Sequence, residues 1–458
     1  MARTQDLTLD RDFGDNSTGA RVRLLRSETM KQSTPDYQEV RETMPTPHRD
    51  SNSVLKTIDL FSGCGGLATG FEMAKIAGGG RFECVGAIDN WQAACDAFSL
   101  NHPVKATCAG VSEESVGAIL DKVGQVDVIA GGPPCQGFST SGKRTLDDPR
   151  NSLVKAYFGA VALAKPRVFL MENVSGFTTF QDGAIMREVL ELARELGYKP
   201  FPGIVLASLC GVPQRRRRFI LVGVREGTFE FPNQRRVSAQ GHGGNLFEAG
   251  SAEGDSNSLV VDQRPSHGTE QWTFTDATCD LPGIEAGEES TSYASAPANA
   301  YQAWAREGAP DALADHVACG HREYFVKMMS FIPQGRSAMD PEIQALMPAD
   351  LRPKSGFPNS YARIRGDEPS PTITRNFTTP SSANCIHPMR NRSLTLREGA
   401  RCQSFPDRYQ FAGSHGDRRL MIGNAVPPLL ARALGVQILR SLSGAQGSDV
   451  PALAGSAS

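Results

Sequence analysis

The sequence predicts an α/β protein with a doubly wound, mostly parallel sheet and a second, smaller domain. Strand-like apolar runs alternate with helix-like segments from residue 54 onward, and two of these runs lead into glycine-rich turns. Such alternation implies right-handed crossovers and a sheet covered by helices on both faces. After residue 235 the alternation gives way to short mixed segments with many prolines, which predicts the second domain.

The expected elements follow from the apolar pattern and from the glycines and prolines that interrupt it. The expected strands are 54–61, 82–88, 126–130, 167–171, 200–209 and 218–224. The expected helices are 67–75, 92–100, 153–164 and a closing helix at 428–442.

Composition restricts the class of protein. The chain has 458 residues, of which 40% are hydrophobic, and a formal net charge of −2, so any contact with phosphates must come from a local basic face. Its ten cysteines are irregularly spaced, which argues against a disulfide framework and against a structural zinc site. We find no secretory signal and no apolar run of membrane-spanning length, so we expect a cytoplasmic protein without a membrane partner.

A glycine-rich corner follows the first strand. Asp59-Leu60-Phe61 leads into Ser62-Gly63-Cys64-Gly65-Gly66 and then into a helix. Glycines let a ligand approach the backbone, and the helix N-terminus offers free N–H groups. Asp89, at the end of the next strand, could accept hydrogen bonds from a ribose diol. Many nucleotide-binding folds share this pattern, and a tight turn without a ligand remains the alternative.

A cysteine follows the third strand. The run Gly131-Gly132-Pro133-Pro134-Cys135-Gln136 places Cys135 at the carboxyl end of a central strand, where open α/β sheets bind ligands. Most free cysteines are small buried hydrophobes, which suits Cys84 and Cys95. Two prolines and a glutamine beside Cys135 are not typical of a core, so we expect Cys135 to be reactive.

Two further groups are expected beside Cys135. Glu172 ends the next strand, where a carboxyl group with a raised pKa could donate a proton. Ahead of the last strand, Arg216 and Arg218 should share one face, and Arg215 and Arg217 the other. A solvated basic run remains the alternative for Arg215 and Arg217.

Together these segments resemble the DNA (cytosine-5) methyltransferase family, and they occur in the family's order between residues 55 and 442. The resemblance rests on six motifs: Asp59–Gly66, Pro133-Pro134-Cys135-Gln136, Glu172-Asn173-Val174, Gln214-x-Arg216-x-Arg218, Arg397–Pro406 and Gly423–Pro428. One feature departs from the family, because residues 105–110 lack the acid that usually contacts adenine.

The resemblance implies a Rossmann-like methyltransferase fold and S-adenosylmethionine as cofactor. The thiolate of Cys135 would attack carbon 6 of a flipped-out cytosine while Glu172 binds ring nitrogen 3. The implied catalytic residues are Cys135, Glu172, Arg216 and Arg218. The implied cofactor-binding residues are Phe61, Gly63, Gly65, Gly66, Leu67, Asp89, Pro134, Asn424 and Ala425, and no metal is implied.

The resemblance also implies double-stranded DNA as partner and a target-recognition domain. We expect DNA contacts from Gln136, Ser139, Arg215, Arg217, Arg363, Arg365 and Arg375. The expected parts are a disordered extension (1–53), a catalytic domain (54–235), a flexible connection (236–268), a target-recognition domain (269–394), a segment completing the catalytic domain (395–443) and a flexible tail (444–458). We expect a monomer, and a restriction endonuclease of the same system is a compatible partner.

Three other classes of protein compete with this interpretation. A transfer-RNA cytosine-5 methyltransferase would share the catalytic motifs, but it predicts a shorter segment between Val224 and Leu396. A non-catalytic DNA-binding regulator would not need Cys135 or Glu172. A nicotinamide-dependent oxidoreductase would account for the glycine corner and Asp89 but not for the Pro-Pro-Cys-Gln motif or the later motifs.

Overall fold

The computed structural model describes residues 54–76, 80–134, 152–232, 261–262 and 271–444, all of which belong to one compact unit. The expected 1–53 extension, nearly all of the 444–458 tail and most of the 236–268 connection lie outside these residues. Two residues of that connection, Val261–Asp262, form a short strand that pairs with the sheet.

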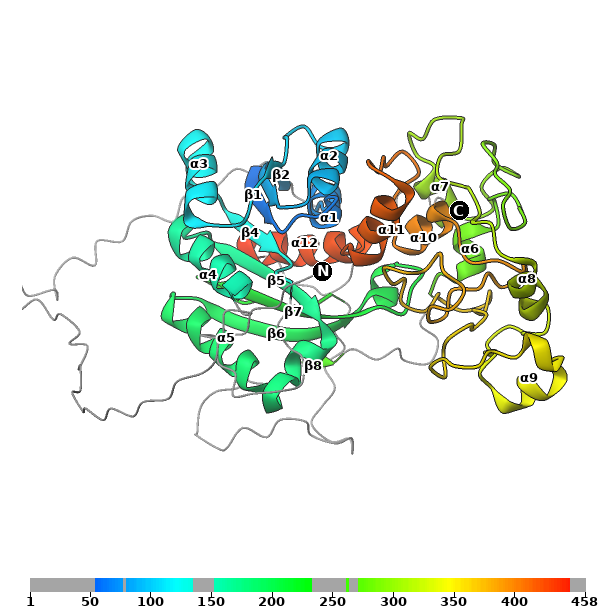
Figure 1. Ribbon diagram of the computed structural model, residues 1–458. Coiled ribbons are helices and arrows are strands. Elements are labelled where there is room, and N and C mark those ends of the chain that lie inside the picture. The colour runs from blue at the N-terminus through cyan, green and yellow to red at the C-terminus, as the bar shows by residue number, and fades with distance from the viewer. Residues whose placement is uncertain (1–53, 77–79, 135–151, 233–260, 263–270, 445–458) are drawn as a thin grey trace, which may run out of the picture. The chain divides into compact units, whose positions relative to one another are not determined.

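The described residues form one eight-stranded sheet with the order β3-β2-β1-β4-β5-β7-β6-β8 (Figure 1). Every pairing is parallel except those of β7 with β5 and β6. The strands are β1 (Val54–Leu60), β2 (Arg81–Asp89), β3 (Thr107–Cys108), β4 (Val128–Gly131), β5 (Val168–Val174), β6 (Lys199–Leu206), β7 (Arg217–Val224) and β8 (Val261–Asp262). The predicted α/β fold class is therefore confirmed.

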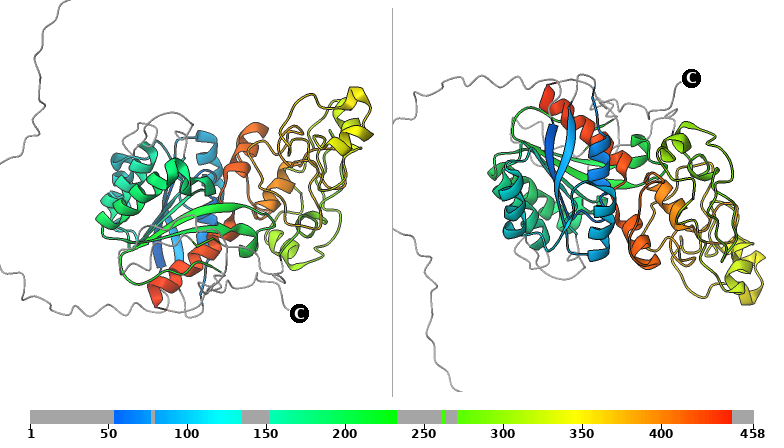
Figure 2. Two further views of the ribbon diagram at one scale, coloured as in Figure 1. Left: turned by 90° about the horizontal axis from the view of Figure 1, so that it is seen from below. Right: turned by 90° about the horizontal axis from the view of Figure 1, so that it is seen from above.

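Helices cover both faces of the sheet, as the apolar strands require (Figures 1 and 2). In β7, Ile220 and Val222 pack into one hydrophobic cluster, whereas Phe219 and Leu221 pack into another. The first cluster includes residues of α1 (Gly66–Met73) and α12 (Pro428–Ser443). The second includes residues of α3 (Glu113–Val123), α4 (Ser152–Ala164) and α5 (Ala184–Glu195). The strands are thus buried on both sides, which explains their nearly continuous apolar sequences.

The antiparallel direction of β7 follows from its short connection to β6. The link at 207–216 contains only the 3-10 turn Ala207–Cys210, whereas a parallel neighbour would need a longer crossover. As a result β7 begins at the edge where β5 ends, with Arg218 paired to Val174.

Residues 271–424 form short helices joined by irregular chain, with only isolated bridges among them. The helices are α6 (Phe274–Thr278), α7 (Ala300–Ala305), α8 (Glu323–Met329), α9 (Pro341–Leu346), α10 (Leu396–Cys402) and α11 (His415–Asn424). Ile373 and Phe377 share a hydrophobic cluster with Cys64 and with Ala94 of α2 (Gln92–Asn101), so this region packs directly against the sheet domain.

The stretch His415–Ser443, which contains α11 and α12, is long and apolar enough to cross a membrane by composition. However, 83% of its apolar window is buried inside the protein. α12 supplies Leu429, Leu430 and Leu434 to the cluster shared with α1, so it serves as a core helix. This is the closing helix that the sequence predicts.

Candidate active site

The carboxyl ends of the central strands bring the predicted motifs to one edge of the sheet. Leu60 of β1 is paired with Gly131 of β4, and Gly131 is paired with Met171 of β5. The glycine corner after β1, the Pro133-Pro134 turn and Glu172 therefore lie side by side. β7 joins them from the opposite direction and adds Arg218.

The glycine corner has a strained backbone with room for a ligand at one position. Phe61, Gly63 and Gly65 have φ values of 55°, 52° and 94°. A side chain at Gly63 would meet no atom within 4 Å, so this glycine borders open space. By contrast, an added Cβ at Gly65 would lie 2.6 Å from His102 Nε2, and one at Gly66 would lie 2.1 Å from the Val426 carbonyl oxygen. Packing thus requires glycine at positions 65 and 66, and the predicted contact of their backbone with a ligand stays a prediction.

Asp89 shapes this corner from the end of β2. Its carboxylate accepts hydrogen bonds from the backbone N–H of Gly63 at 2.8 Å and of Trp91 at 2.9 Å. Each carboxylate oxygen can accept a further hydrogen bond, so the predicted ribose contact is compatible with these two.

Two buried polar atoms at this corner lack a partner among the described residues, namely Asp59 Oδ1 and Ser62 Oγ. Asp59 is 2% exposed, and its other oxygen accepts from the Ala68 N–H at 3.2 Å. Burial raises the pKa of Asp59 from 3.8 to about 8. Unpaired buried polar groups are costly, so the corner fits a ligand that brings its own polar groups. Asp59 is not among the site residues expected from the sequence, although an acid near the end of an apolar strand is a signal for one.

Cys135, Gln136 and Ser139 lie outside the described residues, but the chain leading to Cys135 is described. Asn173 donates from Nδ2 to the carbonyl oxygen of Pro133 at 3.1 Å. A Cβ added at Gly132 would lie 3.1 Å from Glu172 Oε2. Glu172 therefore lies against the segment that leads to Cys135, and Asn173, which the sequence argument did not single out, holds that segment.

Glu172 forms an ion pair with Arg218, with 2.7 Å between Oε1 and Nε, and both side chains are 13% exposed. The structure thus brings together two residues predicted to share a crevice. The guanidinium of Arg218 fixes the orientation of the Glu172 carboxyl group through this contact.

Burial alternates along the basic run as predicted, with Arg216 buried, Arg218 half-buried, and Arg215 and Arg217 exposed. Arg216 does not contact Glu172 by any hydrogen bond in the described residues; it donates to the carbonyl oxygens of Ile373 at 3.0 Å and Gly423 at 3.2 Å. Arg216 thus connects two distant segments of the chain, and its expected catalytic role stays a prediction.

Gln214 also connects segments that are distant along the chain. It is fully buried, its Nε2 donates to the Cys402 carbonyl oxygen at 3.1 Å, and its Oε1 accepts from the Ile373 N–H at 2.8 Å. From the sequence Gln214 is only one position of a motif, without an expected role.

The remaining expected cofactor residues differ in exposure. Asn424 is exposed and Ala425 is half-buried at the end of α11, and Pro134 is exposed. Leu67 is 4% exposed and packs into the core with α12, so its side chain faces away from the corner. Among the described residues no group of His, Cys, Asp and Glu is arranged to hold a metal ion.

The arginines expected to contact DNA fall into two groups. Arg375 is exposed, Arg215 pairs with Glu368, and Arg365 pairs with Asp367 and Glu368. Arg363 is different, because it is 6% exposed and its guanidinium is directed inward. Its five N–H groups donate at 2.6–2.7 Å to Ile332 O, His387 O, Arg390 O, Met329 O and Asn391 Oδ1. No donor is left for a base edge, so the prediction that Arg363 reads DNA needs correction.

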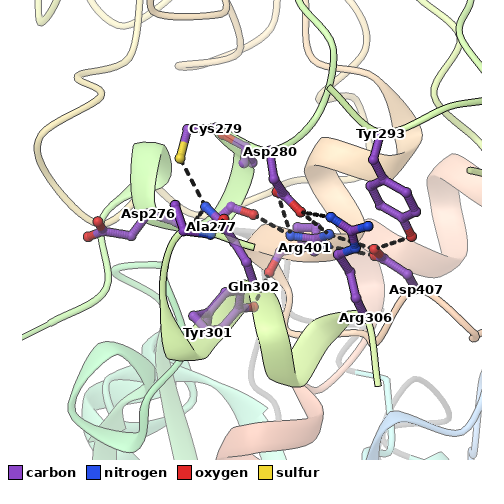
Figure 3. Close-up of polar contacts among 12 residues, drawn as sticks. Asp276, Ala277, Cys279, Asp280, Tyr293, Tyr301, Gln302, Arg306, Arg401 and Asp407 are labelled. Carbon is purple, nitrogen blue, oxygen red and sulfur yellow. Dashed lines mark hydrogen bonds and ion pairs between the residues drawn. The ribbon is translucent and has the colours of Figure 1, made fainter. Parts of the chain in front are cut away.

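A second buried arginine organises the region around α6, α7 and α10 (Figure 3). Arg401 lies between two carboxylates, donating to Asp407 at 2.5 and 2.6 Å and to Asp280 at 3.2 Å. Tyr293 Oη donates to Asp407 at 2.8 Å, and Tyr301 Oη donates to the Arg401 carbonyl oxygen at 2.5 Å. The network fixes the path of the chain and is not part of the sheet-edge site.

Known proteins resemble this chain over most of its length. The family model described as C-5 cytosine-specific DNA methylase matches residues 55–440. The type II methyltransferase M.DdeI of Desulfomicrobium norvegicum is 34% identical over 402 residues, covering 84% of this chain and 88% of that protein. M.AgeI of Thalassovita gelatinovora is 34% identical over 449 residues, covering 85% of this chain and 100% of that protein. DNA (cytosine-5)-methyltransferase 1 of Mus musculus is 30% identical over 84% of this chain, which spans 28% of that protein.

Solved structures share the fold at lower identity. A protein from an E. coli prophage, described as a DNA modification methyltransferase, superposes with a TM-score of 0.61 at 23% identity and covers 85% of this chain and 99% of its own. A variant of Spodoptera frugiperda DNMT2 gives a TM-score of 0.51 at 15% identity, with coverage of 84% and 99%. At these identities the likeness shows the architecture alone.

Proposed function

Because the chain belongs to the C-5 cytosine-specific DNA methylase family and is therefore a DNA (cytosine-5) methyltransferase, we propose a specific reaction for it. The methyl group of S-adenosylmethionine is transferred to carbon 5 of a flipped-out cytosine in a specific duplex sequence, through a covalent adduct with Cys135. The observation that carries the proposal is the Glu172–Arg218 pair beside the chain leading to Cys135.

The described corner residues suit this cofactor, and the family and fold are S-adenosylmethionine-dependent in general. Gly63 leaves the backbone accessible, and Asp59 and Ser62 present buried polar atoms that need partners. The amino and carboxylate groups of the cofactor's methionine part would supply such partners, and Asp89 would accept from its ribose. When bound, the cofactor supplies an electrophilic methyl group.

The chain's own residues prepare the cytosine. The thiolate of Cys135 bonds to carbon 6, and Glu172 contacts ring nitrogen 3, where charge develops. Arg218 holds the carboxylate in place at 2.7 Å, while Asn173 fixes the backbone just before Cys135. After carbon 5 is methylated, loss of its proton and elimination of Cys135 restore the aromatic ring. Because the base must leave the duplex, flipping costs a few kcal/mol.

The DNA contacts are proposed for exposed groups. Arg215, Arg217 and Arg375 suit phosphate contacts, and Gln136 and Ser139 are expected beside the flipped base. Sequence choice is assigned to residues 269–394, without Arg363. The relatives named type II methyltransferases favour a modification enzyme that is paired with a restriction endonuclease and acts on DNA in the cytoplasm. A monomeric state is part of the same proposal.

The decisive experiment is bisulfite sequencing of DNA from a host without cytosine methylation that expresses this chain. We expect 5-methylcytosine at one short sequence, its loss in Cys135→Ala, and its retention in Cys279→Ala, a control at another cysteine, which is exposed. Unmethylated host DNA together with methylated transfer RNA would contradict the proposal and favour the RNA enzyme.

A further inference from the structure

We infer that His102, acting through Thr69 and together with Glu72, is a positioning residue for the glycine corner, where the cofactor is proposed to bind. His102 follows the last residue of α2 and is 7% exposed. Its ring lies next to Gly65 of the corner and does not belong to the sheet-edge site. The inference rests on the proposed function, because the corner is assigned to S-adenosylmethionine there.

A chain of hydrogen bonds connects Glu72 to the backbone of the corner. His102 Nδ1 lies 3.1 Å from both carboxylate oxygens of Glu72, and His102 Nε2 lies 3.2 Å from Thr69 Oγ1. Thr69 Oγ1 in turn donates to the carbonyl oxygen of Gly65 at 2.7 Å.

The single hydroxyl proton of Thr69 fixes the direction of this chain. Since that proton goes to Gly65, Thr69 Oγ1 can only accept from His102 Nε2. Nδ1 can bond to the Glu72 carboxylate only as a donor. The His102 ring therefore connects the Glu72 carboxylate to the Thr69 hydroxyl group, with one ring nitrogen directed at each.

The chain holds the corner in one conformation. The Gly65 carbonyl oxygen also accepts from the Thr69 N–H at 2.9 Å, and Tyr409 Oη donates to the preceding carbonyl oxygen, that of Cys64. In a trans peptide the N–H points away from the C=O. Fixing the Gly65 oxygen therefore fixes the Gly66 N–H at the start of α1, on the opposite side of the peptide.

Packing leaves the corner no alternative position on this side. Phe98 stacks on the His102 ring with 4.2 Å between centroids. A Cβ at Gly65 would lie 2.6 Å from His102 Nε2 and 2.8 Å from Phe98 Cδ2. Behind the ring, Thr69, Glu72, His102 and Tyr409 line a cavity of about 330 Å³. Packing thus confines the corner on the side of Phe98, whereas on the side of the cavity the hydrogen bonds of Thr69 and His102 hold it.

The test compares two threonines with the same local geometry. Thr69 and Thr278 are each 7% exposed, and each donates to the carbonyl oxygen four residues earlier, at 2.7 and 2.8 Å. Only Thr69 is linked to His102 and to the corner. Thr69→Val and Thr278→Val remove the same hydroxyl group without changing volume, and Thr69→Ser restores it.

Calorimetric titration of the full chain with S-adenosylmethionine, without DNA, is the primary readout. We expect Kd to rise about three- to tenfold in Thr69→Val, to return toward wild type in Thr69→Ser, and to stay unchanged in Thr278→Val. KM for the cofactor should rise in parallel while kcat at saturation is kept. Glu72 lines the cavity and is partly exposed, so Glu72→Gln should disturb the core less than a change at His102. This variant should also raise Kd.

A Kd in Thr69→Val and Glu72→Gln equal to that of wild type would overturn the inference. A loss of kcat and of thermal stability with unchanged Kd would also overturn it, because that pattern indicates structural support alone. Failure of wild type to bind S-adenosylmethionine would instead refute the proposed function.

Discussion

Two buried acids in different regions of the molecule have pKa values shifted in opposite directions. Asp59, under the glycine corner, is 2% exposed and has no cation partner among the described residues, and burial raises its pKa to about 8. Asp407, after α10, is 6% exposed. Burial alone would raise its pKa too, but hydrogen bonds and charge from Arg401 and Arg397 hold the pKa of Asp407 below its usual range.

The difference reflects how each region satisfies its backbone. In the sheet, strand pairing satisfies the main-chain groups, so polar side chains at the strand ends are available to a ligand. Residues 271–424 have only isolated bridges in the described chain, and buried arginines bind the carbonyl oxygens and carboxylates instead. Arg392, Arg397 and Arg401 are 0% exposed. A buried arginine in an irregular region is therefore better read as internal support than as a DNA contact.

The largest effect is expected when Arg401, the cation between the two buried carboxylates, is replaced. Arg401→Met should lower the free energy of unfolding by about 3–5 kcal/mol, because the buried carboxylates of Asp280 and Asp407 would lose the cation that lies between them and keep only the weaker contacts with Arg306 and Arg397. Urea denaturation followed by circular dichroism measures this. Arg408→Met, at an exposed neighbour that donates to one carbonyl oxygen, is the control and should cost less than about 1 kcal/mol. Equal effects would mean that the network adds nothing.

A second prediction concerns Arg363. Arg363→Met should cost about 2–3 kcal/mol of unfolding free energy, because several buried carbonyl oxygens lose their donor. At a temperature where the variant remains folded, its preferred methylation sequence should be unchanged. Denaturation and bisulfite sequencing of the same variant check both parts. A stable variant with altered sequence preference would restore Arg363 as a base-reading residue.

The third prediction concerns the pH dependence of stability that arises from Asp59. The pKa of Asp59 is about 8 in the folded state and near 4 when unfolded, so the folded protein keeps a proton that the unfolded chain releases between these values. This contribution to stability is complete below about pH 4 and is lost as pH rises through 8. Between pH 6 and 8, wild type should lose about 2 kcal/mol relative to Asp59→Asn. Parallel pH profiles for the two proteins would show that Asp59 is already ionised.

The smallest effect is expected at an exposed arginine. Arg375→Ala should leave the unfolding free energy unchanged and weaken DNA binding by about 1 kcal/mol, with a shallower salt dependence if the contact is to phosphate. Fluorescence anisotropy at several salt concentrations measures both. A destabilised protein with unchanged DNA affinity would place Arg375 among the internal arginines.

The sequence predicted the sheet well because strand patterning is local. Alternating strands and helices and the glycine corner were all found at the expected positions, including the strand Val126–Ala130, which the structure has as Val128–Gly131. The pairing of Glu172 with Arg218 could be anticipated because each lies at one end of an apolar strand.

The errors have physical causes that no local pattern reveals. Arg363 looks like a surface cation in the sequence, but its partners are carbonyl oxygens of other segments, such as Ile332 O and Arg390 O. The packing that requires glycine at positions 65 and 66 was not predicted, because His102 and Val426, which exclude a side chain there, cannot be located from sequence. Asp59 was missed because its unusual protonation depends on complete burial.

The contacts that hold the glycine corner have a consequence for the order of folding. Cys64 lies near the start of the described chain, but the hydroxyl group that binds its carbonyl oxygen belongs to Tyr409, 345 residues later. Contacts across such a separation form late, since the loop they close must be ordered before they contribute. At about 5–20 residues per second, synthesis of that intervening segment takes on the order of half a minute. The nascent chain is thus expected to carry β1 through β7 without affinity for S-adenosylmethionine, and to acquire it only when the last helices emerge from the ribosome.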